Sequence, residues 1–307
     1  MKMAGKSTTQ EKILPAGGQA VIEGVLMMSP HHIAIAVRKP NKKIKIKTEK
    51  ISQFSQKYKI LGIPFIRGVV NLFQMMYIGT KALNYSANIA MEEEKEELGF
   101  FSIALSIILA LGFAIFVFKF LPLLIAQGFS YVFLSVANST ILYNAIDGIF
   151  KIGIFILYLL AISMMKDVKR VFQYHGAEHM AVNCYEARKK LTIQNVRSFS
   201  TRHPRCGTSF IIFVLFLSVI IYTFIPMNYG FFAKFLLRIA LLPVIAGISY
   251  ELLKMSAKYS DHKVMSKLIM PGLWFQGLTT RIPDNKQIEV SIAALTAALK
   301  AERGRKA

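Results

Sequence analysis

The sequence is short of cysteine, tryptophan and acidic residues. It has two cysteines, one tryptophan, and 17 Asp and Glu against 38 Lys and Arg in 307 residues. Two cysteines cannot form the disulfide framework of a small secreted domain. Residues 1–20 are polar and rich in glycine, without the apolar run and cleavage site of a signal peptide, so we expect none. The glycines within residues 16–27 lack G-x-G-x-x-G spacing, which argues against a dinucleotide-binding site.

Apolar residues and positive charge are both abundant. Hydrophobic residues make up 54% of the chain, its mean hydropathy is +0.44 and its formal net charge is +21. These values conflict in a soluble protein but agree in a membrane protein whose charges lie on one side of the bilayer. No DNA- or RNA-binding motif accompanies the positive charge, so we expect no nucleic acid among the partners.

Four apolar stretches are each close to the roughly 20 residues that cross a bilayer. They are Phe100–Leu124, Tyr143–Met165, Thr208–Ile225 and Tyr229–Tyr250. The sequence therefore predicts a mainly α-helical, multi-pass membrane protein with about four transmembrane helices. Residues 123–142 are also apolar, but polar residues interrupt them, and we expect this segment at the outer interface.

The distribution of Lys and Arg predicts the orientation. Residues 120–146 and 226–233, which would connect the spans on one side, contain no charged residue. Residues 166–207 carry nine Lys or Arg against three acids, residues 254–307 carry ten against four, and the region before the first span carries fifteen Lys or Arg. Because such residues concentrate in cytoplasmic segments, we expect a cell-membrane protein with both termini in the cytoplasm, beside the anionic headgroups of the bilayer.

The N-terminal region predicts a small α+β unit. Ile33–Arg38 and Lys43–Thr48 are strand-like runs separated by Lys-Pro-Asn-Lys, which is a turn signal. Pro64–Ala90 is apolar, but as a span it would move the basic residues 166–207 to the outside. We therefore expect an interfacial or re-entrant helix there. The alanine-rich residues 288–307 predict an exposed helix with a basic end.

These features divide the chain into five segments. The first is a cytoplasmic region with a β-hairpin and the interfacial helix (1–98), and spans one and two follow (99–166). A cytoplasmic helical loop (167–207) leads to spans three and four (208–253), and a cytoplasmic tail (254–307) ends the chain.

The cytoplasmic loop contains the sequence His-Gly-Ala-Glu-His. Residues 167–190 have no proline and one glycine, which indicates a helix, and His175 and His179 share a face because they lie four residues apart. Glu178 lies on the same side. Two imidazoles can bind a divalent metal, with zinc the best fit, while the carboxylate takes a proton from metal-bound water. The alternative is two surface histidines that contact lipid phosphate or backbone groups.

Further ligands are available near this helix. His203 and Cys206 lie directly before the third span and, if both joined the two histidines, would close a structural site. A carboxylate in their place would leave a position open for water, and Glu251, at the cytoplasmic end of the fourth span, ranks first because an acid there is costly unless it is paired or functional. Supporting candidates, for which a simple surface role is the alternative, are Glu23, Glu186 and Arg205.

Helix geometry separates two neighbours from the site. Glu186 lies roughly 10 Å along the helix from His179, too far for the same ion, and we expect it to pair with Lys190. Cys184 lies about 140° around the helix from His179, so we reject it as a ligand. We expect His31 and His32, which follow a proline in a turn, at the surface. Five arginines, if clustered at the inner interface, would bind anionic headgroups or a phosphorylated substrate. The alternative is that they only set the topology. They are Arg67, Arg170, Arg197, Arg202 and Arg205.

Four blocks of sequence resemble the YqhQ-like family of bacterial integral membrane proteins. They are AGGQAVIEGVLMMSP, GIPFIRGVVNLF, KDVKRVFQYHGAEHMAVNCYEA and RHPRCGTSF, and the resemblance extends over residues 15–284. The family is of unknown function and is described as predicted metal-dependent enzymes, so the resemblance implies a bacterial multi-pass membrane protein and supplies no substrate. Its signature falls on His175, Glu178, His179, His203 and Cys206, and on Gly17, Gly18 and Glu23. HGAEH also matches the H-x-x-E-H pattern of inverted zinc peptidases, which are soluble proteins of another fold.

Three functions fit these patterns. The first is a metal-dependent hydrolase with Glu178 as base and a site facing the cytoplasm, acting on a membrane protein, a peptide or a lipid-linked molecule. The second is a non-enzymatic scaffold in which a structural His/Cys metal site organises protein partners. A small-solute transporter is the third, and it is disfavoured because no broken-helix repeat is visible and the spans hold few ionisable groups. Those groups, mostly near span ends or four residues apart, are Asp147, Lys151, Lys234 and Arg238.

Overall fold

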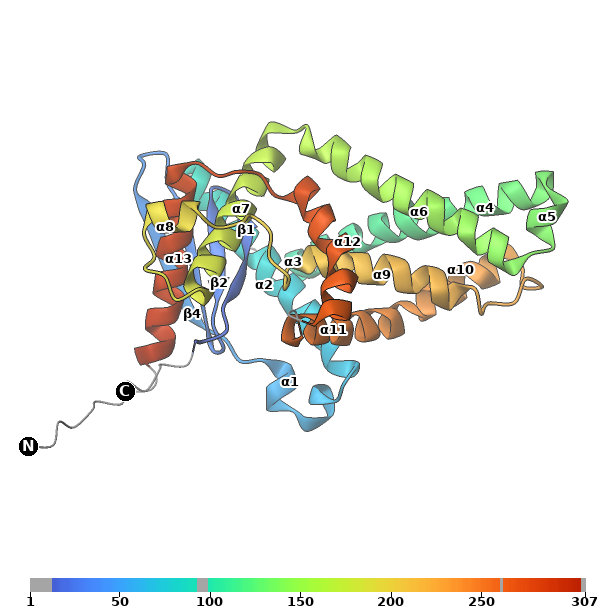
Figure 1. The fold of residues 1–307 in the computed structure, drawn as a ribbon, viewed down its shortest axis with the longest axis horizontal. Coiled ribbons are helices and arrows are strands. Elements are labelled where there is room, and N and C mark those ends of the chain that lie inside the picture. Colours follow the sequence, from blue (N-terminus) through green and yellow to red (C-terminus); the bar gives the residue numbers. More distant parts are fainter. Residues whose placement is uncertain (1–12, 93–98, 260–261, 305–307) are drawn as a thin grey trace, which may run out of the picture.

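The computed structural model describes residues 13–92, 99–259 and 262–304. Over these residues the protein is mainly helical and has one small antiparallel sheet near the N-terminus. Figure 1 shows two parts: the sheet with the helices that cover it, and a bundle of long helices that extends away from it.

The sheet contains four antiparallel strands in sequence order, β1 (Gly17–Val21), β2 (Gly24–Met28), β3 (His32–Arg38) and β4 (Ile44–Lys50). The predicted hairpin is confirmed as β3–β4, in which Ile35 lies opposite Lys47. The glycine-rich segment, for which no strand was predicted, forms β1 and β2. The β2 run Gly-Val-Leu-Met-Met contains only apolar residues, as expected of a strand that is buried on both faces.

Helices cover both faces of the sheet. Val25 and Met27 of β2 pack against α7 (Lys166–Glu186) and α13 (Asn285–Gly304). Leu26, between them, packs on the opposite face with residues of α2 (Ile66–Met91). This alternation follows from the two-residue period of a strand, and it places α7 firmly against the sheet (Figure 1).

The C-terminal helix was predicted correctly as a helix and wrongly as exposed. In α13, Ile288 and Leu295 are fully buried and Glu302 is 3% exposed. The alanines between them allow close packing against the sheet, where the facing strand also carries alanines. His31 and His32 are not free at the surface either, since their Nδ1 atoms lie 2.7 and 3.0 Å from the carboxylate of Glu302.

Two helices are long and apolar enough to cross a membrane. The first is continuous over Phe100–Val132 and comprises α3 (Phe100–Ile115), a π-helical turn η2 (Phe116–Phe120) and α4 (Leu121–Val132). It therefore includes much of the segment that was expected at the outer interface. The second is α6 (Thr140–Ser163), which the short α5 (Leu134–Ala137) precedes.

The third and fourth predicted spans are less regular. A third candidate arises if α10 (Phe231–Ala240) and α11 (Leu242–Lys258), which are bent by 40° at their junction, count as one span. The apolar α9 (Gly207–Tyr222) has only 16 residues. Among the described residues, length and composition thus support two or three spans, against the four predicted.

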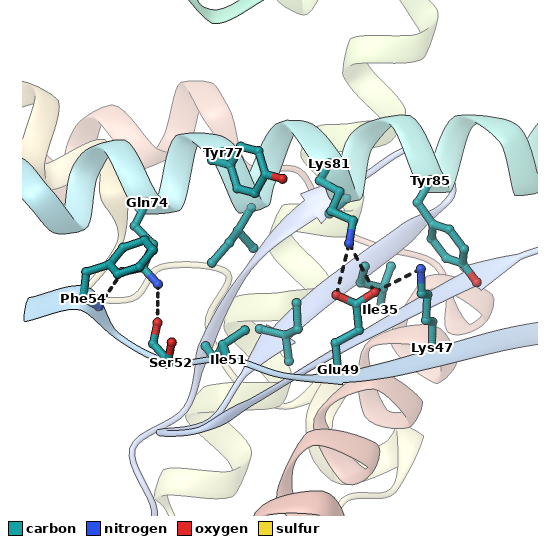
Figure 2. Close-up of a pocket in the computed structure, with 13 residues that line it drawn as sticks. Ile35, Lys47, Glu49, Ile51, Ser52, Phe54, Gln74, Tyr77, Lys81 and Tyr85 are labelled. Carbon is teal, nitrogen blue, oxygen red and sulfur yellow. Dashed lines mark hydrogen bonds and ion pairs between the residues drawn. The ribbon is translucent and has the colours of Figure 1, made fainter. Parts of the chain in front are cut away.

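Four further elements complete the fold. They are α1 (Phe54–Lys57), the 3-10 turn η1 (Lys59–Gly62), α8 (Ile193–Arg197), which packs against α7 and α13, and α12 (Lys263–Thr279), which packs against α6, α9 and α11. A pocket of about 210 Å³ lies between α2 and strands β3 and β4. Figure 2 shows Lys47 and Lys81 converging on Glu49 there, at 3.0 and 3.4 Å. The other side chains that line it are mainly apolar or aromatic and include no histidine or cysteine.

Candidate metal centre

Helix α7 carries the His-Gly-Ala-Glu-His sequence and confirms the predicted helix up to Glu186. Gly176 brings it close to the segment that joins α12 and α13, because a Cβ at this position would lie 2.2 Å from the carbonyl oxygen of Arg281. The backbone N–H of Arg281 donates to the carbonyl of Phe172 at 2.9 Å. This close contact places the end of α12 beside the first histidine of the motif.

The loop before α9 is held in place by amide side chains. Asn183 of α7 donates to the carbonyls of Ser200 and Arg202, at 2.8 and 3.0 Å. Gln276 of α12 is fully buried and makes two hydrogen bonds of 2.8 Å with the backbone of His203, one as donor and one as acceptor. These contacts bring the start of α9 against the histidine face of α7.

His175, His179 and Cys206 converge on one point. Their ligand atoms all lie within 4.8 Å of one another, and Cys206 Sγ is 3.3 Å from His175 Nε2. The two imidazole centroids are 4.4 Å apart. His175 is half-buried, while His179 and Cys206 are buried. No other group of three His, Cys, Asp or Glu side chains meets this closely within the described residues.

The orientation of each imidazole is fixed by a backbone carbonyl. His175 Nδ1 lies 2.9 Å from the Thr279 oxygen, and His179 Nδ1 lies 2.6 Å from the Thr201 oxygen. Because a carbonyl oxygen only accepts, each Nδ1 carries the proton and each Nε2 offers its lone pair. Metal-binding histidines in proteins are held in this way.

Cys206 is placed at the start of a helix. It is the N-cap residue of α9, and its Sγ accepts a hydrogen bond of 3.4 Å from the backbone N–H of Thr208. Its Sγ therefore lies at the N-terminal end of α9, beside backbone N–H groups that have no partner within the helix. The thiolate is the form that binds a metal.

Glu178 lies beside the three convergent residues. It is 4% exposed, and its Oε2 is 3.4 Å from His179 Nε2. Burial raises the pKa of Glu178, although the nearby His175 and His203 and a hydrogen bond from the Gly18 backbone act in the opposite direction. Burial also lowers the pKa of His179 and so favours the neutral imidazole that binds metal.

His203 joins the pocket but faces another partner. Its ring centroid is 5.8 Å from that of His179, and its Nε2 is 3.2 Å from Glu186 Oε2. Glu186 also forms an ion pair with Arg205. The predicted pairing of Glu186 with Lys190 is therefore wrong: the loop before α9 folds back over the end of α7, where Arg205 and the imidazole of His203 are the partners of Glu186.

Two of the carboxylates considered from sequence lie elsewhere. Glu251 on α11 accepts hydrogen bonds of 2.8 and 2.5 Å from Arg67 of α2. Glu23 lies in the turn between β1 and β2, where it pairs with Arg170 and accepts a hydrogen bond of 3.3 Å from Tyr174. Neither residue is among the convergent ligands, and neither lines the pocket beside them.

A pocket of about 580 Å³ opens beside the three ligand residues. Glu178, His203 and Arg205 line it together with Gly17 and Gly18 of β1 and Met75 of α2. From the residues alone, the glycines gave no sign of this role. The sequence also gave no sign of Thr201 and Thr279, because they act through backbone carbonyls. Cys184, rejected as a ligand, is buried in the core between α7 and the sheet.

Comparison with known proteins identifies relatives over the whole site. A family model described as "Protein of unknown function (DUF1385)" matches residues 63–301. The chain is also 35% identical to "Uncharacterized protein YqhQ" of Bacillus subtilis (strain 168) over 308 residues, which covers 96% of this chain and 95% of that protein. No solved structure matches the chain.

Proposed function

The chain belongs to the DUF1385 family of proteins of unknown function, and we propose that it is a membrane-embedded, metal-dependent hydrolase. His175, His179 and Cys206 bind a divalent metal, with zinc the best fit, and Glu178 is the general base. One observation carries the proposal: both histidines donate Nδ1–H to backbone carbonyls, so that both Nε2 atoms and the Cys206 sulfur converge.

The ligand set favours a catalytic site over a structural one. Structural zinc sites have four protein ligands, whereas catalytic sites have three and keep a fourth position for water. His203 is the nearest additional imidazole, but its Nε2 is directed to Glu186. The three ligands also border a pocket rather than a closed core. Both features support a fourth coordination position that is open to water.

Each residue then has a defined task. A bound zinc ion supplies a Lewis acid and makes its water more acidic. Glu178, through Oε2, takes the proton from the attacking water and delivers it to the leaving group. The buried position of its carboxyl group favours such exchange, because burial brings the pKa of an acid closer to neutrality. Arg205 lines the same pocket and is suited to hold an anionic part of the substrate.

The proposed setting is the cytoplasmic face of the cell membrane. The protein crosses the bilayer four times with both termini inside: the long helices over Phe100–Val132 and Thr140–Ser163 are the first two spans, and α9 and the bent α10–α11 pair are the others. The basic segments then meet anionic headgroups. The substrate class is a membrane protein, a peptide or a lipid-linked molecule that reaches the pocket from the bilayer surface.

Cobalt substitution tests whether the site is open. The purified protein is loaded with Co²⁺, and its visible spectrum is recorded before and after addition of acetohydroxamate, which binds metals at free positions. We expect a sulfur-to-cobalt charge-transfer band, lost in Cys206→Ala and kept in Cys184→Ala, and a change in the d–d bands on adding acetohydroxamate. Glu178→Gln should keep both signals. A spectrum that acetohydroxamate leaves unchanged would assign the metal to a structural scaffold instead.

A further inference from the structure

A second group of charged side chains lies inside the helical bundle. The sequence placed four of these charges mostly near span ends or four residues apart. The structure instead buries these four and Lys119 near one another, at 0–7% exposure. The group, which we call the cationic cluster, consists of Lys119 of η2, Asp147 and Lys151 of α6, and Lys234 and Arg238 of α10.

One carboxylate forms ion pairs with two of the four cations. Asp147 Oδ2 lies 2.9 Å from Lys151 Nζ, and Asp147 Oδ1 lies 2.7 Å from Arg238 Nη1. Asn144 adds a neutral acceptor, with its Oδ1 2.7 Å from Arg238 Nη2. Asp147 is fully buried and about two turns inside α6, so these contacts lie within the bundle and away from the helix end.

The other cations have only aromatic partners in the described structure. Lys119 donates to the Tyr222 hydroxyl at 3.2 Å, and Lys234 lies 4.6 Å from the centroid of the Tyr143 ring. The Tyr222 ring has three cations around it, since Lys119, Lys151 and Arg238 lie 5.1, 4.9 and 4.7 Å from its centroid. Neither Lys119 nor Lys234 pairs with a carboxylate of the described residues.

The donors of this cluster exceed its acceptors. Four cations against one carboxylate leave three positive charges (4 − 1 = 3) when all groups are ionised. In addition, the Nε of Arg238 is buried and has no hydrogen-bond partner within the described residues. An unpaired ionised side chain is strongly unfavourable within a membrane, and such residues usually line a functional site.

We propose that the cationic cluster binds the phosphate group of a ligand within the bundle. Arg and Lys are the side chains that proteins use for phosphate. Arg238 Nε has no hydrogen-bond partner, and Lys119 and Lys234 have no carboxylate partner, among the described residues. A phosphate group offers several acceptor oxygens and carries one negative charge as a diester or up to two as a monoester or inorganic phosphate. This site is separate from the metal centre, which lies on α7 against the sheet (Figure 1).

The elements that carry the unpaired lysines are irregular. Lys119 lies on the π-helical turn η2, and π-helical turns within α-helices are frequent at functional sites. Lys234 and Arg238 lie on the 10-residue helix α10, which ends at the 40° bend before α11. Interrupted helices of this kind supply ion and substrate sites in membrane proteins.

Phosphate-dependent stabilisation tests the proposal on the full-length protein in a neutral detergent. The melting temperature is measured with sodium phosphate against sodium chloride at equal ionic strength, and separately in nanodiscs of phosphatidylcholine with and without phosphatidylglycerol. A ligand that binds only the folded protein raises the melting temperature. A rise in melting temperature with inorganic phosphate identifies a small phosphate ligand. A rise with phosphatidylglycerol alone identifies a lipid headgroup, and either result supports the site.

Two variants connect the gain to the cluster. Lys119→Gln and Lys234→Gln each remove an unpaired buried cation, so we expect an unchanged or higher melting temperature without ligand and a loss of the ligand-induced gain. Lys166→Gln, at an exposed position at the start of α7, should keep the full gain. Two results would overturn the proposal. In the first, phosphate raises the wild-type melting temperature no more than sodium chloride does, and phosphatidylglycerol adds nothing to phosphatidylcholine alone. In the second, both cluster variants gain as much as the wild type.

Discussion

The carboxylate of Glu302 joins the C-terminal helix to the sheet, and its removal should cost measurable stability. Glu302 accepts hydrogen bonds from Ser29 and from His31, and the imidazoles of His31 and His32 both lie against its oxygens. Burial alone would raise the pKa of Glu302, but these hydrogen bonds outweigh burial and lower it from 4.5 to about 2. The side chain is 4% exposed, so solvent screens these contacts little.

The size of the effect follows from this pKa. A difference of about 2.5 units between the folded and unfolded states corresponds to roughly 3 kcal/mol at neutral pH. Because the folded-state pKa is the lower one, this stabilisation is complete above about pH 4.5 and is lost as the pH falls toward about 2. Glu302→Gln keeps one acceptor oxygen, so roughly 3 kcal/mol is an upper limit for its destabilisation.

Thermal unfolding, followed by circular dichroism in detergent, measures this effect. We expect Glu302→Gln to melt several degrees below the wild type at neutral pH and the gap to narrow on acidification. Glu289→Gln is the matched control, because Glu289 lies on the same helix and is 53% exposed, and such surface ion pairs contribute at most about 1 kcal/mol. Equal melting temperatures at neutral pH, or a gap that stays constant in acid, would refute the role of Glu302.

Two further predictions concern the metal centre. Gly176→Ala places a Cβ 2.2 Å from the Arg281 carbonyl oxygen, so α7 must shift and metal content should fall; Gly153→Ala, where a Cβ meets nothing within 4 Å, should keep it. Glu251→Gln should bind as much metal as the wild type, because Glu251 is held by Arg67. Metal loss in Glu251→Gln but not in Arg67→Gln would instead make Glu251 a ligand.

Patterns in the sequence predicted the elements whose periodicity is strong. The alternation of Ile and Lys in Lys43–Thr48 gave the β3–β4 hairpin, and the apolar lengths gave the two long helices. The helical spacing of His175 and His179 correctly placed them on one face of α7. By contrast, the burial of α13 depends on its packing against a sheet formed almost 250 residues earlier. A local alanine-rich pattern cannot report such a distant partner.

The choice among carboxylates and soft ligands also depended on tertiary contacts. Cys206 was one of several candidates from sequence, and only the folding of the loop over α7 brings its sulfur to the two histidines. Glu251 ranked high because an acid at the end of a span needs a partner, and this reasoning was sound. The partner is Arg67, which lies 184 residues away in sequence. The burial of the charges inside the bundle was not predicted either, because it also depends on contacts between segments that are far apart in sequence.

The most direct test of the metal centre is the metal content of the purified protein. The full-length chain, purified in detergent without chelators, is analysed by inductively coupled plasma mass spectrometry beside its variants. We expect one zinc ion per chain, lost in His175→Ala, His179→Ala and Cys206→Ala, and retained in Glu178→Gln and in His262→Ala, where the histidine is exposed. A wild type that binds no stoichiometric metal, or ligand variants that bind as much as the wild type, would contradict the metal centre.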